Sequence, residues 1–406
     1  MKKQVNKARW MRLNRIGSAV LGAAMTLMAT RSLLAAPKNV IVIVAEGLDA
    51  PQCALGADYA KVAYEEDLQT ASLLQSDPGH AFSGVPMLKG LLQKANGKGY
   101  TTGLVTTDDV VSGIARFYDV PLKGERAGPA DVENVLKTSA NLVLGGGWGY
   151  FAQKSKPKSL RNDELDMLVE ARSAGWKTLM TPEDLFALPA GAKALGLFSD
   201  KGLKYALDTD PMKAPTFFEL VDSAMTHLGS GSFLVIHNHL IAKACKEKDP
   251  AALVEEVREL DAVIAHVMET AKVKPDTLAV VVSSPAANNP VFSSGADRDE
   301  SLYTIKSLPL SLSSGSKKAA EIGVNQWIEE HYVNFRVTPD QQGGVGTDPA
   351  KIMDLFVSVF GGMTNVSWEK SSGGSVVVRG AGTGWDDLKS ATDAASLESK
   401  LAALTP

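Results

Sequence analysis

Residues 39–45 read Asn-Val-Ile-Val-Ile-Val-Ala, an unbroken run of apolar and mostly β-branched side chains. A strand that is covered on both faces has this composition, because neither side of it meets water. Comparable apolar runs recur along the chain at residues 101–107, 141–144, 193–198, 232–236 and 277–283. Their recurrence predicts a sheet of buried parallel strands in the interior.

The segments between these runs carry helical patterns. In residues 251–271 the apolar side chains recur every three or four positions and form one apolar stripe. Asp249 and Pro250 supply a cap and a first-turn proline at the start of this helix. Strands that alternate with helices predict an α/β fold, in which a mostly parallel central sheet lies between two layers of helices.

Composition limits the classes of function. The chain has 406 residues, of which 45% are hydrophobic and 22% are charged, so it can bury a large core and is not expected to be disordered. Its formal net charge is -4, which argues against the broad basic surface that nucleic acid requires. We therefore expect no nucleic-acid partner.

The first 36 residues differ from the rest of the chain. Basic residues between Lys2 and Arg15 precede an apolar run at residues 16–28. This run is shorter than the roughly 20 residues that a membrane-spanning helix needs, so a retained anchor is the less favoured alternative. The sequence predicts a signal peptide at residues 1–36, export to the periplasm or the cell surface, and no integral membrane span.

The two cysteines, Cys53 and Cys245, permit at most one disulfide in an oxidising compartment. A pair of buried thiols is an equal alternative, because free cysteine is commonly buried. The sequence leaves this choice open.

The composition changes near residue 340, after which glycine and serine frame short apolar pieces. We therefore expect a main domain at residues 37–339, followed at residues 340–406 by a small C-terminal subdomain or interaction segment. Residues 376–378, Val-Val-Val, are a candidate edge strand through which a protein partner or a second copy of the chain could add to the sheet.

Ligand sites of parallel α/β sheets lie beyond the carboxyl ends of the strands. The residues in that position are Glu46-Gly47, Asp108-Asp109, Gly145–Gly147, His237-Asn238-His239 and Ser284-Pro285. Two neighbouring aspartates are more typical of a helix cap or a solvated turn than of a catalytic pair. We interpret the three glycines as a backbone turn, because residues 148–151 do not have the pattern of a helix start.

Several segments, taken in order, resemble the bacterial alkaline phosphatases over residues 38–305. Residues 38–47 are similar to the first strand of that family and its Gly-Asp-Gly metal turn, and residues 142–147 are similar to its glycine turn. Further similar pieces follow at residues 102–107, 170–176, 195–200, 205–208, 215–216, 257–261 and 275–278. Their shared order supports the fold, whereas the function has to be checked residue by residue.

Members of this family hydrolyse phosphomonoesters with a serine nucleophile, two zinc ions and one magnesium ion, which are bound by Asp, Glu, Thr and His at strand ends. The resemblance places Glu46 on the first metal aspartate, which keeps a carboxylate there. It places the nucleophilic serine on Pro78, or implies that this position is deleted, and it places Ile114 on the magnesium-binding threonine. Neither replacement can perform the original chemistry.

The remaining positions are also altered. His237 stands in place of the magnesium glutamate, Ala242 in place of a zinc aspartate and Lys246 in place of a zinc histidine. Pro285 and Ala286 replace an Asp-His pair after the next strand. Because alanine, proline and lysine side chains cannot hold a divalent cation cluster, the resemblance implies a degenerate homologue with no catalytic residues and no cofactor.

We therefore predict a catalytically inactive alkaline phosphatase-like protein of the cell envelope, which acts as a binding or structural subunit in a protein assembly. The alternative is a metal-dependent phosphomonoesterase or related hydrolase, with Zn or Mg in a rebuilt site at Glu46, His237 and His239. A third interpretation is anion binding without turnover; the candidate cations for it are Lys123, Arg126, Lys243 and Lys246. A lysine fixed near the old metal positions would also relieve repulsion among the surrounding acids.

Overall fold

The central sheet has nine strands in the order β2-β11-β8-β1-β7-β3-β4-β6-β5. In this computed structural model the described residues are 36–68, 80–82, 88–331, 337–338, 343–373 and 376–404. Most of the predicted signal peptide, and Pro78, lie outside them. The strands are β1 (Asn39–Glu46), β2 (His80–Phe82), β3 (Thr101–Asp109), β4 (Leu142–Gly146), β5 (Lys177–Leu179), β6 (Ala194–Leu197), β7 (Ser232–Asn238), β8 (Thr277–Ser284) and β11 (Val376–Gly382).

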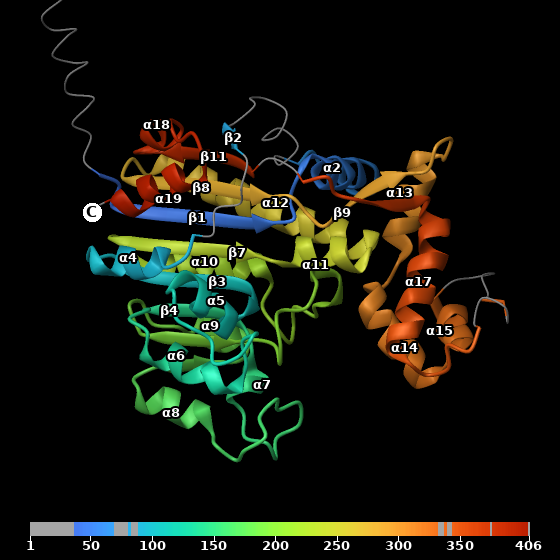
Figure 1. Ribbon diagram of the computed structural model, residues 1–406, viewed down its shortest axis with the longest axis horizontal. Helices are drawn as coiled ribbons and strands as arrows, with labels where there is room; N and C mark the ends of the chain where they lie inside the picture. The colour runs from blue at the N-terminus through green and yellow to red at the C-terminus, as the bar shows by residue number, and fades with distance from the viewer. Residues whose placement is uncertain are drawn as a thin grey trace, which may run out of the picture.

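From β8 to β5 all neighbouring strands pair in parallel, and only β11 and β2 form antiparallel pairs. The apolar run in β1 follows from its place inside this sheet (Figure 1). Ile41 and Ile43 pack into the core on one face of the sheet, whereas Val42 and Val44 pack into the core on the other. All six predicted strands are present, which confirms the predicted α/β fold with a mostly parallel sheet.

Helices cover both faces of the sheet. One core is formed with α2 (Ala50–Tyr64), α9 (Pro182–Phe186), α10 (Phe217–Leu228), α11 (Leu240–Glu247) and α12 (Pro250–Val273). The opposite core is formed with α4 (Leu91–Gly97), α5 (Val110–Phe117), α6 (Val132–Lys137), α7 (Trp148–Phe151), α8 (Met167–Ser173), α18 (Trp385–Leu388) and α19 (Ala394–Ala403). Short 3-10 turns, η1 (Pro129–Asp131) and η2 (Ala206–Asp208), complete the connections.

The predicted helix at residues 251–271 is α12, and Asp249 caps it by accepting a hydrogen bond from the backbone N–H of Ala252. Its cap and its first-turn proline are therefore confirmed. One interpretation is wrong: residues 148–151 do form a short helix, α7, directly after Gly147. Gly147 reaches the left-handed region, with φ of 105°, which lets the chain turn into a helix without a capping side chain.

A second lobe lies at the right of Figure 1. It contains α13 (Arg298–Ser307), α14 (Leu312–Ile322), α15 (Val324–His331) and α17 (Pro349–Thr364), and a two-stranded sheet of β9 (Asn288–Phe292) and β10 (Val366–Lys370). The indole of Trp327 is buried against the ring of Phe356, with 5.0 Å between the ring centroids. Contacts between aromatic rings therefore hold α15 against α17.

Residues after 340 contribute to both sheets, because β10 pairs with β9 while β11 pairs with β8. The prediction of an edge strand at residues 376–378 is wrong, since β2 pairs with this part of β11 on its outer side. No pattern in the sequence indicates this pairing, because β2 has only three residues and no apolar run. The domain limits at residues 37–339 and 340–406 stay a prediction.

Cys53 in α2 and Cys245 in α11 are both buried free thiols. Burial raises the pKa of both, to about 12 for Cys245, so neither is a reactive thiolate at neutral pH. Across the described ranges, the search for a helix long and apolar enough to cross a membrane finds none.

Candidate functional site

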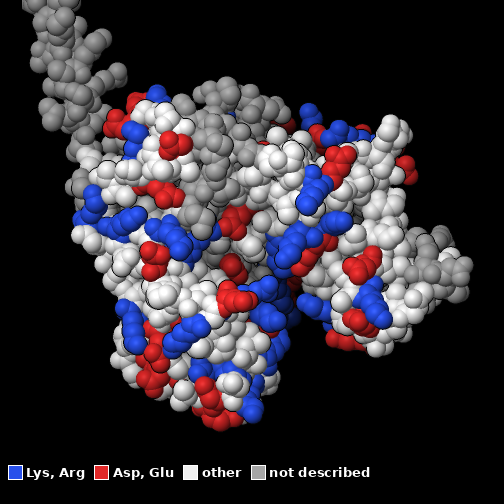
Figure 2. Space-filling model, in the orientation of Figure 1, with Lys and Arg blue, Asp and Glu red and all other residues white. Residues whose placement is uncertain are grey.

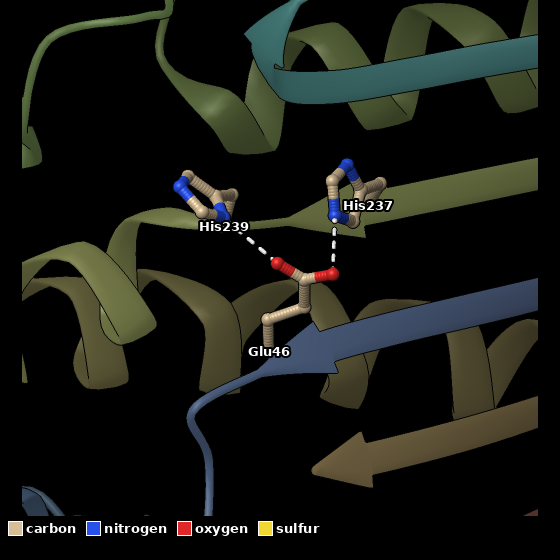
Figure 3. Close-up of side chains that lie close together, drawn as sticks. All are labelled: Glu46, His237 and His239. Carbon is tan, nitrogen blue, oxygen red and sulfur yellow. Dashed lines mark hydrogen bonds and ion pairs between the residues drawn. The ribbon is translucent and has the colours of Figure 1, made fainter. Parts of the chain in front are cut away.

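Three predicted site residues meet above the carboxyl ends of two neighbouring strands (Figure 3). Glu46 is the last residue of β1, His237 lies near the end of β7, and His239 follows β7 by one residue. Ala45 pairs with Asn238 across the two strands, which sets the carboxylate between the imidazoles. Because side chains alternate along a strand, the two histidines point to one side and Asn238 points to the other.

The turn after Glu46 needs a glycine for two reasons. Gly47 has φ of +82°, a conformation that side chains other than glycine rarely adopt. A Cβ at this position would also lie 2.5 Å from the Cα of Ala242 in α11. The turn therefore packs directly on α11, and this contact fixes where β1 delivers the carboxylate of Glu46.

The contacts around Glu46 are close. His239 Nδ1 lies 2.7 Å from Oε2, and His237 Nε2 lies 3.3 Å from Oε1. The second contact is an ion-pair distance without hydrogen-bond geometry, so the buried Nε2 of His237 has no hydrogen-bond partner. Thr106 holds the other side of that ring, since its Oγ1 shares a hydrogen bond of 2.9 Å with Nδ1. The backbone N–H of His239 donates to Thr107 Oγ1.

A guanidinium also contacts the same carboxylate. Arg116, in α5, donates from Nη1 to Oε1 of Glu46 and forms an ion pair with it. The predicted anion-binding cations were Lys123, Arg126, Lys243 and Lys246, and Arg116 was not among them. Its only local signal is an arginine in the short helix that follows β3, and that signal does not reveal a partner 70 residues earlier in the chain.

These contacts set the charge states at the site. Burial acts to raise the pKa of Glu46, but the close contact with His237, the hydrogen bond with His239 and the nearby positive charges outweigh it, so the pKa of Glu46 lies well below its usual range. The hydrogen bond with Glu46 raises the pKa of His239, although burial opposes it. The site therefore favours an ionised carboxylate beside a protonated His239.

One carboxylate and two imidazoles are a donor set that zinc accepts. Their ligand atoms lie within 4.8 Å of one another, and the search of the described residues finds no other group of three such donors. These residues fit a single divalent ion, provided that the guanidinium of Arg116 moves off Oε1. Three ligand residues are too few for a centre of three metal ions.

Apart from His237, the positions at which the resemblance implies a lost metal ligand supply no ligand atom for a metal ion, among the residues that the structure describes. Ile114 is fully buried in α5, and Ala286 is buried after β8. Ala242 packs on the turn at Gly47, and Lys246 is exposed on α11. Pro285 is half-buried beside Ala286.

The four predicted anion-binding cations lie in two places. Lys123 and Arg126 are exposed in the loop between α5 and η1. On α11, the Nζ of Lys243 lies 3.3 Å from Glu247 and 3.9 Å from the ring centroid of Tyr205. A role for these four residues in anion binding stays a prediction.

Asp108 and Asp109 follow the helix-cap interpretation rather than the catalytic one. Asp109 caps α5, since its Oδ1 accepts a hydrogen bond of 2.8 Å from the backbone N–H of Ser112. Asp108 in turn accepts from the N–H of Asp109. Both carboxylates are therefore occupied in shaping the turn between β3 and α5, the helix that carries Arg116.

A parallel sheet with polar side chains gathered at the carboxyl ends of β1, β3 and β7 defines an α/β protein of the kind that binds ligands at this edge. The family model named Alkaline phosphatase matches residues 54–393, and the chain belongs to that family. The resemblance drawn from the sequence is thereby confirmed.

Individual proteins that are similar to this chain are alkaline phosphatases as well. The chain is 33% identical over 184 residues to an alkaline phosphatase of Schizosaccharomyces pombe, a match that covers 42% of this chain and only 35% of that protein. It is 22% identical over 318 residues to alkaline phosphatase 4 of Bacillus subtilis, covering 74% of this chain and 67% of that protein. The crystal structure of a cold-active alkaline phosphatase from a Shewanella species superposes with a TM-score of 0.70 at 19% identity, covering 91% of this chain and all of that one.

Proposed function

We propose that this chain is a non-catalytic member of the alkaline phosphatase family, exported from the cytoplasm, which acts as a binding or structural subunit. The observation that carries the proposal is the guanidinium of Arg116 on the carboxylate of Glu46. A fixed organic cation neutralises the charge that would otherwise attract a metal ion. It cannot, however, accept a phosphoryl oxygen or a water molecule as a ligand, which metal-assisted hydrolysis requires.

The neighbouring positions support the same proposal. Ile114, Ala242 and Ala286 offer no ligand atom, so these three positions supply nothing to a second or a third ion. Thr106, Thr107 and Glu46 hold the histidines at 237 and 239 through hydrogen bonds. A network of this kind can stabilise the edge of the sheet without any bound ion.

The test is a metal analysis of the purified chain together with an assay of p-nitrophenyl phosphate hydrolysis in zinc and magnesium. We expect no stoichiometric metal, and a rate no higher than that of the Glu46→Gln variant. Removing divalent ions with a chelator is expected to leave the melting temperature unchanged. One equivalent of zinc together with turnover that His237→Ala abolishes would overturn the proposal.

The second candidate is a phosphomonoesterase with one metal ion at Glu46, His237 and His239. The buried Nε2 of His237, which lacks a hydrogen-bond partner, favours it. A bound ion would supply a Lewis acid for the phosphoryl oxygen. In this candidate Thr106 orients the ring of His237, Thr107 fixes the backbone of His239, and Arg116 has to leave the carboxylate.

Zinc titration of the native chain and of Arg116→Met separates the two candidates. If the guanidinium excludes the ion, only the variant binds one equivalent tightly. Equal, tight binding by both chains would favour the metal-dependent enzyme. Arg126→Met, which removes an exposed arginine of the next loop, is the matched control and is expected to behave as the native chain does.

The location and the assembly need separate measurements. Fractionation of the producing cells is expected to place the chain outside the cytoplasm, and an N-terminal analysis there is expected to show loss of most of residues 1–36. A native-size measurement on chain extracted from the cell envelope is expected to exceed the 43.0 kDa of one copy. A cytoplasmic monomer that keeps its first residue would contradict the subunit role.

A further inference from the structure

A cavity of about 520 Å³ lies next to Glu46, His237 and His239, the Glu46 cluster, but includes none of these three residues. Thr107, at the end of β3, and Leu240, at the start of α11, form part of its wall. Thr107 is also the residue that accepts a hydrogen bond from the N–H of His239. The cavity therefore opens at the edge of the sheet where α/β proteins bind ligands, and its volume is in the range of small-molecule sites.

The inner wall of this cavity is apolar. Leu197 and Phe198 come from the end of β6, Phe217 begins α10, and Leu240 begins α11. All four side chains are buried, and Trp148 of α7 adds a further aromatic surface. A wall of this composition binds the apolar or aromatic part of a ligand by excluding water from it.

The rim is basic. Lys158, Lys204 and Lys213 are exposed side chains that line the opening. Lys213 forms an ion pair with Asp210, whereas Lys158 and Lys204 form none with any residue that the structure describes. Figure 2 shows many Lys and Arg side chains bordering the hollow between the sheet-bearing body and the second lobe.

Two acidic residues also line the cavity and limit the charge of a ligand. Asp200 lies in the loop between β6 and η2, and Glu259 reaches the cavity from α12. The carboxyl of Glu259 accepts a hydrogen bond of 2.8 Å from the backbone N–H of Phe217. Burial raises the pKa of Glu259, which reduces its negative charge. The remaining balance suits one negative charge better than two.

Exposed methionines continue the apolar surface outward. Met180 lines the cavity with 36% of its surface exposed, and Met212, between two lining residues, is 83% exposed. Methionine adapts its shape to different apolar ligands. The opening thus alternates flexible apolar side chains with lysines.

We propose that this cavity binds an amphipathic organic monoanion, such as an aromatic or aliphatic carboxylate or sulfonate. Its acid group is held by Lys158 and Lys204, and its apolar part lies on Phe198, Phe217 and Leu240. The site uses no residue of the Glu46 cluster, so it stands whether or not that cluster holds a metal ion. The cavity is thus a ligand site that is separate from the candidate metal ligands Glu46, His237 and His239.

The probe is 8-anilino-1-naphthalenesulfonate, an aromatic monoanion whose fluorescence rises in apolar surroundings. We expect saturable binding at one equivalent per native chain, which weakens several-fold between about 0.05 and about 0.3 M salt because screening acts on the lysines. The Lys158→Ala, Lys204→Ala double variant is expected to bind about tenfold more weakly, because both cations are lost. The neutral analogue N-phenyl-1-naphthylamine is expected to bind less tightly than the anion.

Two matched variants complete the test. Lys154→Ala with Lys156→Ala removes two exposed lysines of the same loop that do not line the cavity, and it is expected to bind as the native chain does. Ala214→Trp fills the cavity from its wall and is expected to abolish binding while the melting temperature is retained. Salt-independent binding that the lysine variant leaves unchanged would overturn the proposal, as would displacement of the probe by equimolar inorganic phosphate. Metal content and phosphatase rate are read separately, so failure here is distinguishable from failure of the proposed function.

Discussion

Two regions of the protein bury carboxyl groups, and the pKa is lowered in one region and raised in the other. Glu46, at the end of β1, lies against Arg116 and two imidazoles, and its pKa is lowered. Along α12, Asp249 and Glu256 are held mainly by backbone N–H donors, and burial raises the pKa of both. Asp249 and Glu256 are almost completely buried, whereas 23% of the Glu46 side chain is exposed. Burial acts to raise the pKa of all three acids, so burial alone does not account for the opposite directions. The difference is the presence of a cation in contact with the acid.

This contrast bears on the prediction that a fixed cation would relieve the acids near the old metal positions. Arg116 does this for Glu46. The predicted candidates were Lys243 and Lys246. The charge of Lys243 does act to lower the pKa of Glu256, but burial of Glu256 outweighs it, and Lys246 is exposed on α11. The Nζ of Lys243 is instead bonded to Glu247. Direct contact, rather than mere proximity, therefore decides which acid stays ionised.

The largest effect is expected for Asp249→Asn, which tests the buried acids along α12 that are held mainly by backbone N–H donors. Burial raises the pKa of Asp249 to about 7, from an ordinary value of 3.8, with further help from the charges of Asp208 and Glu247. Between these two pH values the native state keeps a proton that the unfolded chain has released, so the free energy of unfolding falls as pH rises through this window and levels off above it. The asparagine does not titrate, so its stability relative to the native chain should rise by on the order of 4 kcal/mol from about pH 4 to pH 7.

Urea unfolding of both chains across this pH range checks the prediction. Asp354→Asn, at an exposed position of α17, is the control and should run parallel to the native chain. If Asp249→Asn also ran parallel, Asp249 would be ionised in the native state at acid pH. The stated difference between Glu46 and the buried acids of α12 would then be wrong for Asp249.

The ion pair between Glu46 and Arg116 is tested by Arg116→Met, which keeps much of the apolar stem of the side chain and removes its charge. We expect a loss of about 2 to 3 kcal/mol in the free energy of unfolding at neutral pH, because the ionised Glu46 loses its closest cation. The loss is smaller than for a fully buried pair, since 22% of the Arg116 side chain and 23% of the Glu46 side chain are exposed. Chemical denaturation measures it, with Arg126→Met as the control.

The double variant Arg116→Met, Glu46→Gln sharpens the result. Removing both charges should recover part of the stability that the single variant loses, because no unpaired carboxylate remains. A double variant that is less stable than Arg116→Met would mean that the guanidinium is not the main partner of Glu46. The two histidines would then have to carry that role.

The smallest expected effect is on His239, whose side chain is 39% exposed. Its pKa is raised by the hydrogen bond with Glu46. NMR titration of its ring should therefore show a midpoint above the ordinary 6.5 in the native chain, and a downward shift in Glu46→Gln. The ring signals of His331, on α15 in the second lobe, are the internal control and should not differ between the two chains. An unchanged midpoint for His239 would show that the carboxylate does not govern its charge.

The central strands were predictable because a strand buried on both faces leaves a continuous apolar run, as in β1 and β8. The strands β2 and β5 have three residues each, and β9 and β10 are polar, so none of them has such a run. The meeting of Glu46, His237 and His239 could be proposed because all three end neighbouring strands. Arg116 could not, since its contact with Glu46 depends on how α5 packs over the sheet and not on any spacing along the chain.

The order of strands in the sheet has a consequence for how the chain reaches its native state. The first strand, β1, is paired with β7 and β8, whose residues follow about 190 and 240 positions later. During synthesis its backbone donors and acceptors have no native strand partner until β7 has been made, about 190 residues later. A topology with such distant pairings folds slowly, and its most apolar strand is open to wrong contacts in the meantime. We therefore expect refolding from denaturant to be slow and its yield to fall with rising protein concentration.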